Sequence, residues 1–349
     1  MSDPTLDLPF AWGGPAGAGV IRSVPEDFEV VEELGFEPSG TGEHLLVTLV
    51  KRELNTAEVA RQLARVAGLR PRDVSFAGLK DRMAVTTQTF SLHLPGRPDP
   101  DLGELEDGKI RVLAAARHHR KLRRGALRGN RFRLRVRHFR GDGQPLGQRL
   151  EAIAAGGVPN YFGAQRFGRE GNNLQRAEAL FKGELRRVKR EQRGIWLSAA
   201  RSWLFNAVLA ERVRAGNWNR RVPGDVLQPE GSRAQFREAE EAAPDPRLEA
   251  GEVHPTGPLW GRAGRSLEPE GEAAALEACV LEPLDFWKQG LERAGLEMDR
   301  RPLRLCVHDL EWSLQGDELV LGFRLGKGSY ATSVLRELVQ PPHLRDSST

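Results

Sequence analysis

The chain has 349 residues, of which 39% are apolar and 29% charged, a composition that excludes a disordered chain and favours two globular domains or one elaborated domain. No run of about 18 apolar residues predicts a membrane span, and no basic patch followed by an apolar stretch opens the sequence, so we expect a cytoplasmic protein. Two cysteines, Cys279 and Cys306, exclude a disulfide scaffold and a Cys-rich zinc site.

The net charge of +4 conceals an uneven distribution of charge along the chain. Residues 117–140 hold eleven Lys or Arg, three His and no acid, interleaved with apolar residues, which favours contact with a nucleic acid over a solvated tail. Residues 182–193 form a second basic cluster, with six Lys or Arg against two Glu. Residues 230–252 hold seven acids and three Arg, and we expect a solvated loop that faces away from any nucleic acid.

In chain order, the first elements are strands. Apolar and β-branched residues predict strands over residues 28–31, 45–50, 85–94 and 131–137. The last of these alternates Arg with Phe132, Leu134 and Val136, so one face is buried and the other carries arginines. A helix begins after Asn55, which forms a capping-box pattern with Glu58, and ends at Gly68.

Helical signals dominate after residue 161, and strand signals return only near residue 303. Ser198 is the expected N-cap of one helix, which ends at Gly216. A strand over residues 319–325 follows a turn at 315–317, with residues 303–307 as its expected partner, and a last helix covers about 330–339 before Pro341. We therefore predict an α+β fold in which residues 1–154 and 304–349 form a discontinuous β-rich domain and residues 155–303 an inserted α-rich domain.

Several catalytic motifs are missing from the sequence. Residues 322–329 are superficially similar to a phosphate loop, but the spacing is one residue short and Gly328 follows Lys327 where Ser or Thr belongs. HExxH, CxxC and GxSxG motifs do not occur. We expect no cofactor and no metal, so that any catalysis comes from ordinary side chains.

Asp81 lies between Lys80 and Arg82, just before a predicted strand. The flanking cations favour the ionised carboxylate that a nucleophile requires, and Gly78 allows a ligand to approach the backbone closely. Taken alone, this feature is more simply interpreted as a charged surface turn.

A resemblance changes this interpretation of Asp81. Residues 77–88 resemble the catalytic motif AGxKDxxAxTxQ of the TruD family of tRNA pseudouridine synthases, and Asp81 matches the catalytic aspartate of that motif. Further blocks similar to the family lie at residues 25–44, 121–130, 159–168, 197–206 and 328–338.

The resemblance implies a fold and a reaction. The fold would be pseudouridine-synthase-like, a mixed and mainly antiparallel sheet with flanking helices. The reaction would convert uridine at position 13 of tRNA to pseudouridine, by detaching the base at N1 and rejoining it through C5, without cofactor or metal. Asp81 would attack either the ribose C1′ or the base C6, and the sequence does not choose between them.

The resemblance also assigns binding residues. Phe28, Asn130 and Tyr330 match substrate-binding positions, with Tyr330 where close relatives carry Phe. Arg22 matches a family Lys, and we expect it to pair with Asp81, with Lys80 as a further support. The simpler interpretations are core aromatics for Phe28 and Tyr330, a turn residue for Asn130 and a surface residue for Arg22. Cations expected to hold the RNA backbone are Arg120, Lys121, Arg123, Arg124, Arg131, Arg133 and Arg135, together with the cluster at 182–193.

Two other classes of function remain open. A non-catalytic RNA-binding factor with the same fold would have no need of an acid facing phosphates, so the Lys80–Asp81 pair disfavours it. A methyl-donor-dependent enzyme lacks a recognisable Gly-rich cofactor loop. Transfer RNA is the expected partner, and no obligate protein partner is evident.

Overall fold

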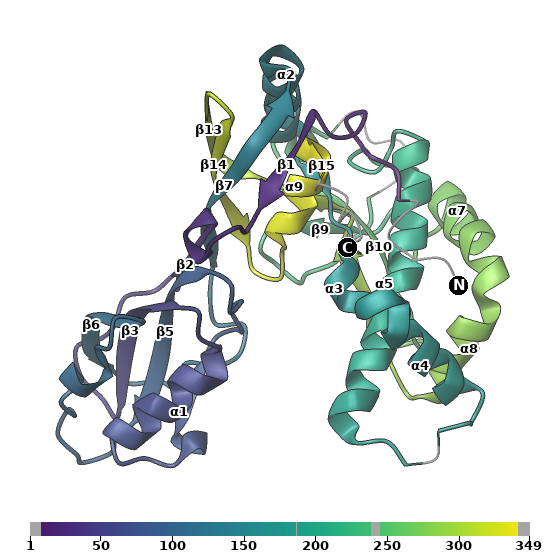
Figure 1. Ribbon diagram of the computed structural model, residues 1–349. Helices are drawn as coiled ribbons and strands as arrows, with labels where there is room; N and C mark the ends of the chain where they lie inside the picture. The colour runs from purple at the N-terminus through teal and green to yellow at the C-terminus, as the bar shows by residue number, and fades with distance from the viewer. Residues whose placement is uncertain (1–7, 186, 239–244, 341–349) are drawn as a thin grey trace, which may run out of the picture. The chain divides into compact units, whose positions relative to one another are not determined.

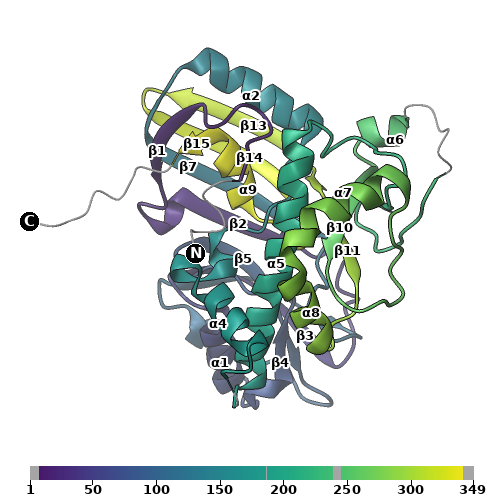
Figure 2. The same cartoon turned by 90° about the vertical axis from the view of Figure 1, so that its right-hand side faces the viewer.

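The computed structural model describes residues 8–185, 187–238 and 245–340, which divide into two compact units (Figures 1 and 2). The sheet unit comprises the described residues among 16–147, 307–329 and 339–349. The helical unit comprises those among 1–15, 148–306 and 330–338. Across the described ranges, every helix is too short or too polar to cross a membrane.

A ten-stranded sheet forms the framework of the sheet unit. Seven strands follow one another in the order β13 (His308–Gln315), β14 (Glu318–Gly326), β7 (Gly129–Gly141), β2 (Phe28–Glu33), β5 (Val85–His93), β3 (His44–Arg52) and β6 (Ile110–His118). The shorter strands are β1 (Gly17–Ile21), β15 (Val339–Gln340) and β4 (Val74–Phe76). Only the pairs β2–β5 and β1–β15 are parallel among the described strands, so the expected mixed, mainly antiparallel sheet is confirmed.

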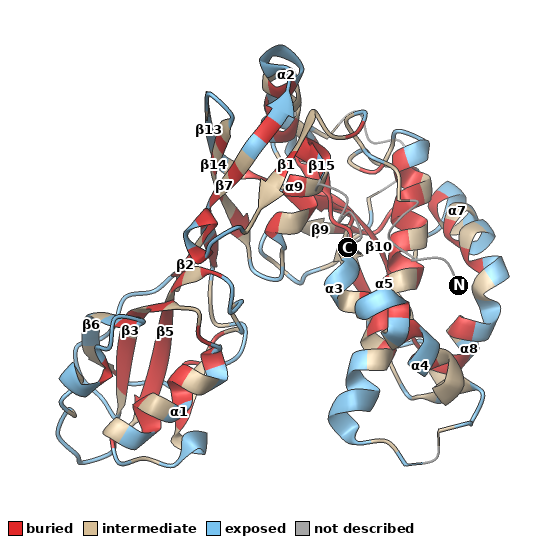
Figure 3. Ribbon diagram, viewed as in Figure 1, coloured by how far each residue is buried: buried red, intermediate tan, exposed pale blue. Residues whose placement is uncertain are grey.

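Helix α1 (Thr56–Val66) covers part of this sheet (Figure 1). Its buried residues Val59 and Leu63 join a core with alternate residues of β3, which Figure 3 shows as a largely buried strand. The helix begins after Asn55 as predicted, but the Asn55 side chain makes no capping bond. It ends before Gly68, whose φ of +57° places it in the left-handed region that favours glycine.

Strand β7 has the predicted alternation of buried and exposed residues. Phe132, Leu134 and Val136 are buried, while the intervening arginines lie on the other face of the strand. The pairing of β7 with β2 places Asn130 opposite Glu32 on the buried face. Polar side chains therefore meet there, beside an otherwise apolar core.

The helical unit is built around one long helix, α5 (Arg190–Arg214). Its buried side chains pack against α4, α7 and α8 (Figure 2). The other helices that lie wholly or largely in this unit are α2 (Gly143–Gly156), α3 (Ala164–Phe167), α4 (Asn172–Phe181), α6 (Pro246–Glu249), α7 (Gly271–Leu281), α8 (Asp285–Arg293) and α9 (Ala331–Leu338).

The helical unit also contains strands, so the expectation that strand signals return only near residue 303 is wrong. A three-stranded sheet joins β9 (Leu227–Pro229), β10 (Val253–Leu259) and β11 (Asp299–Pro302). The central strand β10 contains Pro255, Gly257 and Pro258, which interrupt a strand pattern in the sequence. Pairing with sequence-distant strands, and burial of nearly every residue, produce this strand.

The prediction that residues 303–307 pair with the strand at 319–325 is also wrong. This strand, β14, pairs with β13 and β7, while β12 (Arg304–Leu305) pairs with β8 (Val158–Pro159). Strand β13 is mostly exposed and polar, so its sequence lacks the apolar signal that residues 303–307 carry. The tight turn, with Gln315 paired to Glu318 across Gly316 at φ +61°, brings the neighbouring segment into the hairpin.

Ser198 is not an N-cap, because it lies inside α5. Its hydroxyl accepts a hydrogen bond from Arg166 Nη1 on α3 at 3.0 Å, so this polar side chain has a partner although it lies in the interior of α5. The helix ends as predicted before Gly216, at φ +67°.

The helical unit includes more than the predicted insertion at 155–303. Residues 8–15 and α9 also belong to it, as does the stretch from 148. The assignment of a catalytic domain to residues 1–154 and 304–349 stays a prediction. Residues 239–244 of the acidic segment, residue 186 of the second basic cluster, and the helix stop at Pro341 lie outside the described residues.

Candidate functional site

Asp81 lies in the segment that joins β4 to β5 in the sheet unit. Ala77 and Ala84 anchor the two ends of this segment by burial, whereas Leu79 and Met83 between them are exposed. The Asp81 side chain keeps 46% of its surface exposed, so its carboxylate is accessible to a ligand.

Arg22 follows β1 and forms the predicted ion pair with Asp81. Its Nη2 lies 3.0 Å from Asp81 Oδ2, and its guanidinium lies over the Phe28 ring at 4.1 Å from the centroid. The backbone of Arg22 has a φ of +59°, a conformation that costs a non-glycine residue roughly 1–2 kcal/mol. Such strained residues occur often at functional sites, where the direction of the side chain matters.

Phe28, the first residue of β2, is only 5% exposed. Its ring packs edge to face with Phe132, with centroids 6.2 Å apart, and Arg22 lies over the ring. Phe28 is thus a core aromatic that supports Arg22, and its stacking on a substrate base stays a prediction.

Lys80 joins two buried polar residues from neighbouring strands. Its Nζ lies 3.1 Å from Glu32 Oε2 and also donates a hydrogen bond to Asn130 Oδ1. The side chains of Lys80 and Glu32 are 8% and 0% exposed, so this ion pair is shielded from water. Burial raises the pKa of Glu32 above its ordinary value, and the nearby Lys80 opposes that rise.

The backbone of the Asp81 segment is held by buried side chains. Gln88 Nε2 donates to Gly78 O at 2.7 Å, and Thr56 Oγ1 accepts from Lys80 N at 3.0 Å. Thr56 also donates to Gln88 Oε1 at 3.1 Å, so the two anchors are joined to each other.

Sequence reasoning missed Glu32, Lys51 and Thr56. Two of them could have been found from the sequence. Side chains alternate between the two faces of a strand, and Glu32 and Lys51 lie on the buried faces of β2 and β3, where an apolar residue is expected. A charged residue at such a position must find a buried partner, and here the partners surround the Asp81 segment.

Tyr330 belongs to the helical unit and immediately precedes α9. It is 37% exposed, and its hydroxyl accepts a hydrogen bond from Arg166 Nη2 at 2.9 Å. The hydroxyl that distinguishes this residue from Phe therefore has a partner within its own unit. The role of Tyr330 in substrate binding stays a prediction.

The cations between β6 and β7 form a basic loop, residues 119–128, beside the Asp81 segment. Leu122 is buried next to Ala77, and Gly125 N donates to Ala77 O at 2.7 Å, which ties the loop to that segment. The exposed cations of the basic loop for which no ion pair with a described residue occurs are Arg120, Lys121, Arg123, Arg124 and Arg128. They are therefore available to bind an anion.

The strand arginines differ from the loop cations because each lies near an acid of an adjacent strand. Arg131, Arg133 and Arg135 lie 3.6, 3.9 and 3.3 Å from Glu33, Glu29 and Glu318. A groove of about 480 Å³ crosses this face, and its ionisable lining residues are Glu29, Arg131, Arg133, Asp309, Glu311 and Arg324. The face is thus close to neutral, and its attraction for phosphate is weaker than that of the basic loop.

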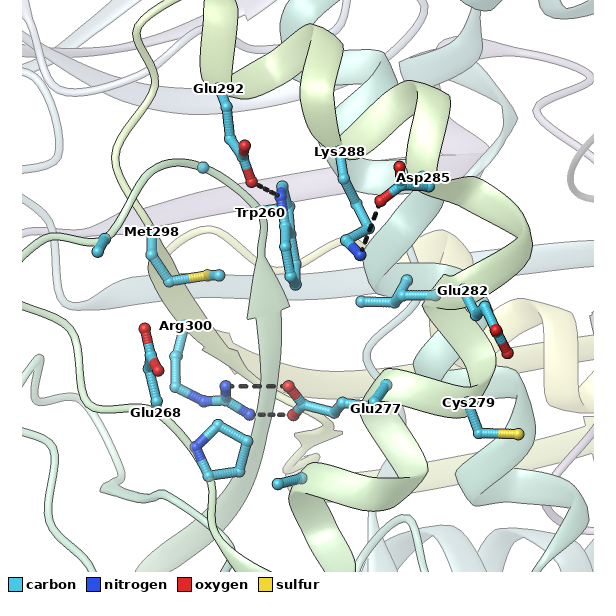
Figure 4. A pocket seen from close by; sticks show the side chains of 16 residues that line it. Trp260, Glu268, Glu277, Cys279, Glu282, Asp285, Lys288, Glu292, Met298 and Arg300 are labelled. Atoms are coloured by element: carbon cyan, nitrogen blue, oxygen red, sulfur yellow. Dashed lines mark hydrogen bonds and ion pairs between the residues drawn. The ribbon is translucent and has the colours of Figure 1, made fainter.

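A larger cavity, of about 760 Å³, lies in the helical unit (Figure 4). Its ionisable lining residues are Glu268, Glu277, Glu282, Asp285, Glu292, Lys288 and Arg300 besides Cys279. Trp260 Nε1 donates to Glu292 at 2.8 Å, and Glu277 pairs with Arg300. No residue predicted for the functional site lines this cavity, and its excess of acids opposes the entry of a phosphate.

One group in the helical unit has the donor atoms of a metal site, namely Glu230, His254 and Cys306. His254 Nδ1 accepts from Arg304 Nε at 3.0 Å, so Nε2 carries the proton and donates to Glu230 at 2.6 Å. Burial raises the pKa of Cys306 to about 11, which keeps the thiol protonated. With a guanidinium beside it, the group is a hydrogen-bond network that does not favour a cation.

Comparisons with known proteins agree on one family. The model of the family described as tRNA pseudouridine synthase D (TruD) matches residues 9–175 and 171–338. The chain belongs to the TruD family. Its relatives include the tRNA pseudouridine synthase D of Methylococcus capsulatus, 51% identical over 96% of this chain and 94% of that protein, and that of Hydrogenovibrio crunogenus, 46% identical over 95% of each.

A solved structure agrees with this membership of the TruD family. The crystal structure of a Methanosarcina mazei protein assigned to tRNA pseudouridine synthase D (TruD) has a TM-score of 0.71 and 25% identity to this chain. The similarity covers 94% of this chain and 95% of that one, so the pseudouridine-synthase-like α+β fold is confirmed.

The ion pair between Lys80 and Glu32 leads to a stability prediction. In Lys80→Met the buried Glu32 loses its cation, so we expect the free energy of unfolding at pH 7 to fall by about 3–5 kcal/mol. Lys80 opposes the rise in the Glu32 pKa, so its loss raises that pKa further, and the folded variant loses stability faster than the unaltered protein as the pH rises above 4.5. The deficit of the variant, measured by urea denaturation, should therefore grow between pH 4 and pH 7.

Lys109→Met is the matched control for this variant, since Lys109 is an exposed lysine of the same unit. It should show no deficit that depends on pH. An equal loss of stability for Lys80→Met at both pH values would contradict the buried ion pair.

Proposed function

We propose that the chain isomerises uridine to pseudouridine in tRNA, at position 13, with Asp81 as the nucleophile. The observation that carries the proposal is the accessible Asp81 carboxylate, held by Arg22 and bordered by the basic loop. It is supported by the TruD relatives, whose names specify tRNA pseudouridine synthase D. Such an enzyme would act in the cytoplasm, where tRNA is found.

The reaction conserves every atom of the uridine. The glycosidic bond between C1′ and N1 breaks, a bond between C1′ and C5 forms, C5 loses its proton, and N1 gains one. Asp81 can assist by attacking C1′, which releases the uracil ring, or by attacking C6 of the ring. Either adduct resolves when the carboxylate leaves again, so no oxidant, reductant or cofactor is consumed.

The target base has to leave its stack before Asp81 can reach it. Phe28 and Tyr330 are the aromatic residues proposed to contact the extruded uracil. Asn130 is proposed to bind it by donating a hydrogen bond, because an ammonium only donates and the Lys80 Nζ already occupies Asn130 Oδ1. The Asn130 Nδ2 hydrogens have no acceptor among the described residues, so they remain for a carbonyl oxygen of uracil.

Asp81→Asn tests the nucleophile. We expect the variant to lose pseudouridine formation on unmodified tRNA by at least about 10³-fold, because an amide cannot form the covalent adduct. Release of tritium from tRNA labelled at uridine C5 measures the reaction. The matched control, Asp101→Asn, changes an exposed aspartate elsewhere in the sheet unit and should keep normal activity.

Two outcomes of this experiment would contradict the proposal. A normal rate for Asp81→Asn would exclude Asp81 as the nucleophile. Tight tRNA binding without any product from the unaltered protein would favour the non-catalytic RNA-binding factor.

Asn130→Asp tests how the base is bound. Aspartate keeps an acceptor for Lys80 but replaces the free donor with a second acceptor. We expect kcat/KM to fall by about 10- to 100-fold, the equivalent of about 1–3 kcal/mol for one unsatisfied group, while the Kd for tRNA stays within about twofold. Asn172→Asp, at an exposed position of the helical unit, is the control. Unchanged kcat/KM in Asn130→Asp would exclude this contact.

The basic loop is the proposed main path for the RNA backbone, with the arginine face of β7 and the cluster at 182–193 as weaker contacts. Arg123→Ala should reduce the slope of log K against log salt by about 1, since one phosphate contact is lost. Arg133→Ala should change the slope less, because Glu29 already lies 3.9 Å from its guanidinium. Filter binding of tRNA between 50 and about 200 mM salt measures both slopes. Equal slopes would mean that the loop and the strand contribute alike.

A further inference from the structure

Lys51, on β3, is a fully buried lysine of the sheet unit. Its Nζ donates to the backbone carbonyl oxygens of Leu54 at 2.8 Å and of Asp81 at 3.0 Å. No carboxylate of the described residues lies within ion-pair distance of this Nζ. Burial lowers the pKa of Lys51 to about 8, an effect that the nearby Asp81 carboxylate opposes. The fold thus retains a buried cation at a position where an apolar side chain of similar length would cost less free energy of folding.

The position of this cation explains its presence. The Asp81 segment lacks apolar anchors in its middle, where Leu79 and Met83 point to solvent and are 70% and 47% exposed. A Cβ added at Gly78 would meet no atom within 4 Å, so packing does not fix the backbone there either. Hydrogen bonds from buried side chains hold the segment instead, and that of Lys51 is made to the Asp81 residue itself.

The three anchors act on successive parts of the segment and come from different elements. Gln88 on β5 holds Gly78 O, Thr56 on α1 holds Lys80 N, and Lys51 on β3 holds Asp81 O. The first two are neutral contacts, whereas an ammonium makes a charge-assisted bond that is roughly twice as strong. The carbonyl oxygen that accepts from Lys51 lies two bonds from the Asp81 Cα, so this hydrogen bond restricts the direction in which the carboxylate points.

We propose that Lys51 is a positioning residue, whose buried ammonium holds the Asp81 carbonyl and so places the carboxylate for attack on the substrate. The proposal rests on the function proposed above for Asp81. A displacement of about 1 Å of a reacting group can reduce the rate by about 10²-fold, so loss of this contact should appear in the chemical step.

Lys51→Met tests the proposal, because methionine fills the same buried space without a donor or a charge. We expect kcat for pseudouridine formation to fall by about 10²-fold. The Kd for tRNA should stay within about twofold, since Lys51 has no access to solvent or to RNA. The free energy of unfolding should be unchanged or higher, since a buried cation without an ion pair is replaced by an apolar group. A merely structural lysine would give the opposite pattern, with stability lost and kcat of the folded fraction kept.

Lys109→Met is the control, an exposed lysine of the same unit that should leave all three quantities unchanged. If Lys51→Met does not fold, Lys51→Gln decides the matter, because it retains a neutral donor that is one atom shorter and should show a smaller loss of kcat. A folded Lys51 variant with kcat within about threefold of the unaltered protein would overturn the proposal. Absence of product from the unaltered protein would instead overturn the function proposed for the chain.

Discussion

The arrangement of the candidate site depends on the ammonium of Lys80. Glu32 lies on β2 with no exposed side-chain surface, and a carboxylate in that position requires a cation. Lys80 supplies it and also binds Asn130 on β7, because an ammonium can satisfy several acceptors but cannot accept. The ammonium of Lys80 therefore holds the Glu32 carboxylate and orients the Asn130 amide, and these two contacts in turn fix Lys80 beside Asp81. Each of the three groups loses its environment if any other is removed.

The same principle of pairing divides the basic residues of the sheet unit into two classes. On β7 the arginines face acids of β2 and β14, so their charges are largely neutralised within the protein. In the basic loop the cations have no such neighbours among the residues that the structure describes, and Arg124 lies over the Phe76 ring at 4.1 Å from its centroid. A count of basic residues along the sequence cannot separate these classes, because the neutralising acids lie on strands that are distant in sequence.

Much of the sheet unit could be predicted from local patterns. The alternation around Phe132 and the turn at Gly316 are both present, since each follows from the backbone of a few consecutive residues. The Arg22–Asp81 pair was also predicted, although it came from the family resemblance and not from spacing. The prolines of β10 and the polar residues of β13 hide strands that exist only through pairing with distant segments.

The buried polar residues could have been predicted in part. Glu32 and Lys51 break the apolar parity of their strands, which marks them as unusual, but their partners are groups of one loop far along the chain. The alternation of side chains along a strand shows that a charge is buried, whereas only the order of the strands in the sheet shows which group compensates that charge. Prediction of the site from sequence therefore named Asp81, Arg22, Lys80, Phe28 and Asn130, and left out Glu32, Lys51 and Thr56.

The planar guanidinium of Arg22 lies over the Phe28 ring, with its Cζ 4.1 Å from the ring centroid. A nucleobase that stacks on this side of Phe28 has to take the place of the guanidinium. The same guanidinium lies 3.0 Å from Asp81 Oδ2, so a base that displaced it from the ring would also change the ion pair with Asp81. The position of Arg22 therefore links the face of the Phe28 ring to the charge balance of the Asp81 carboxylate.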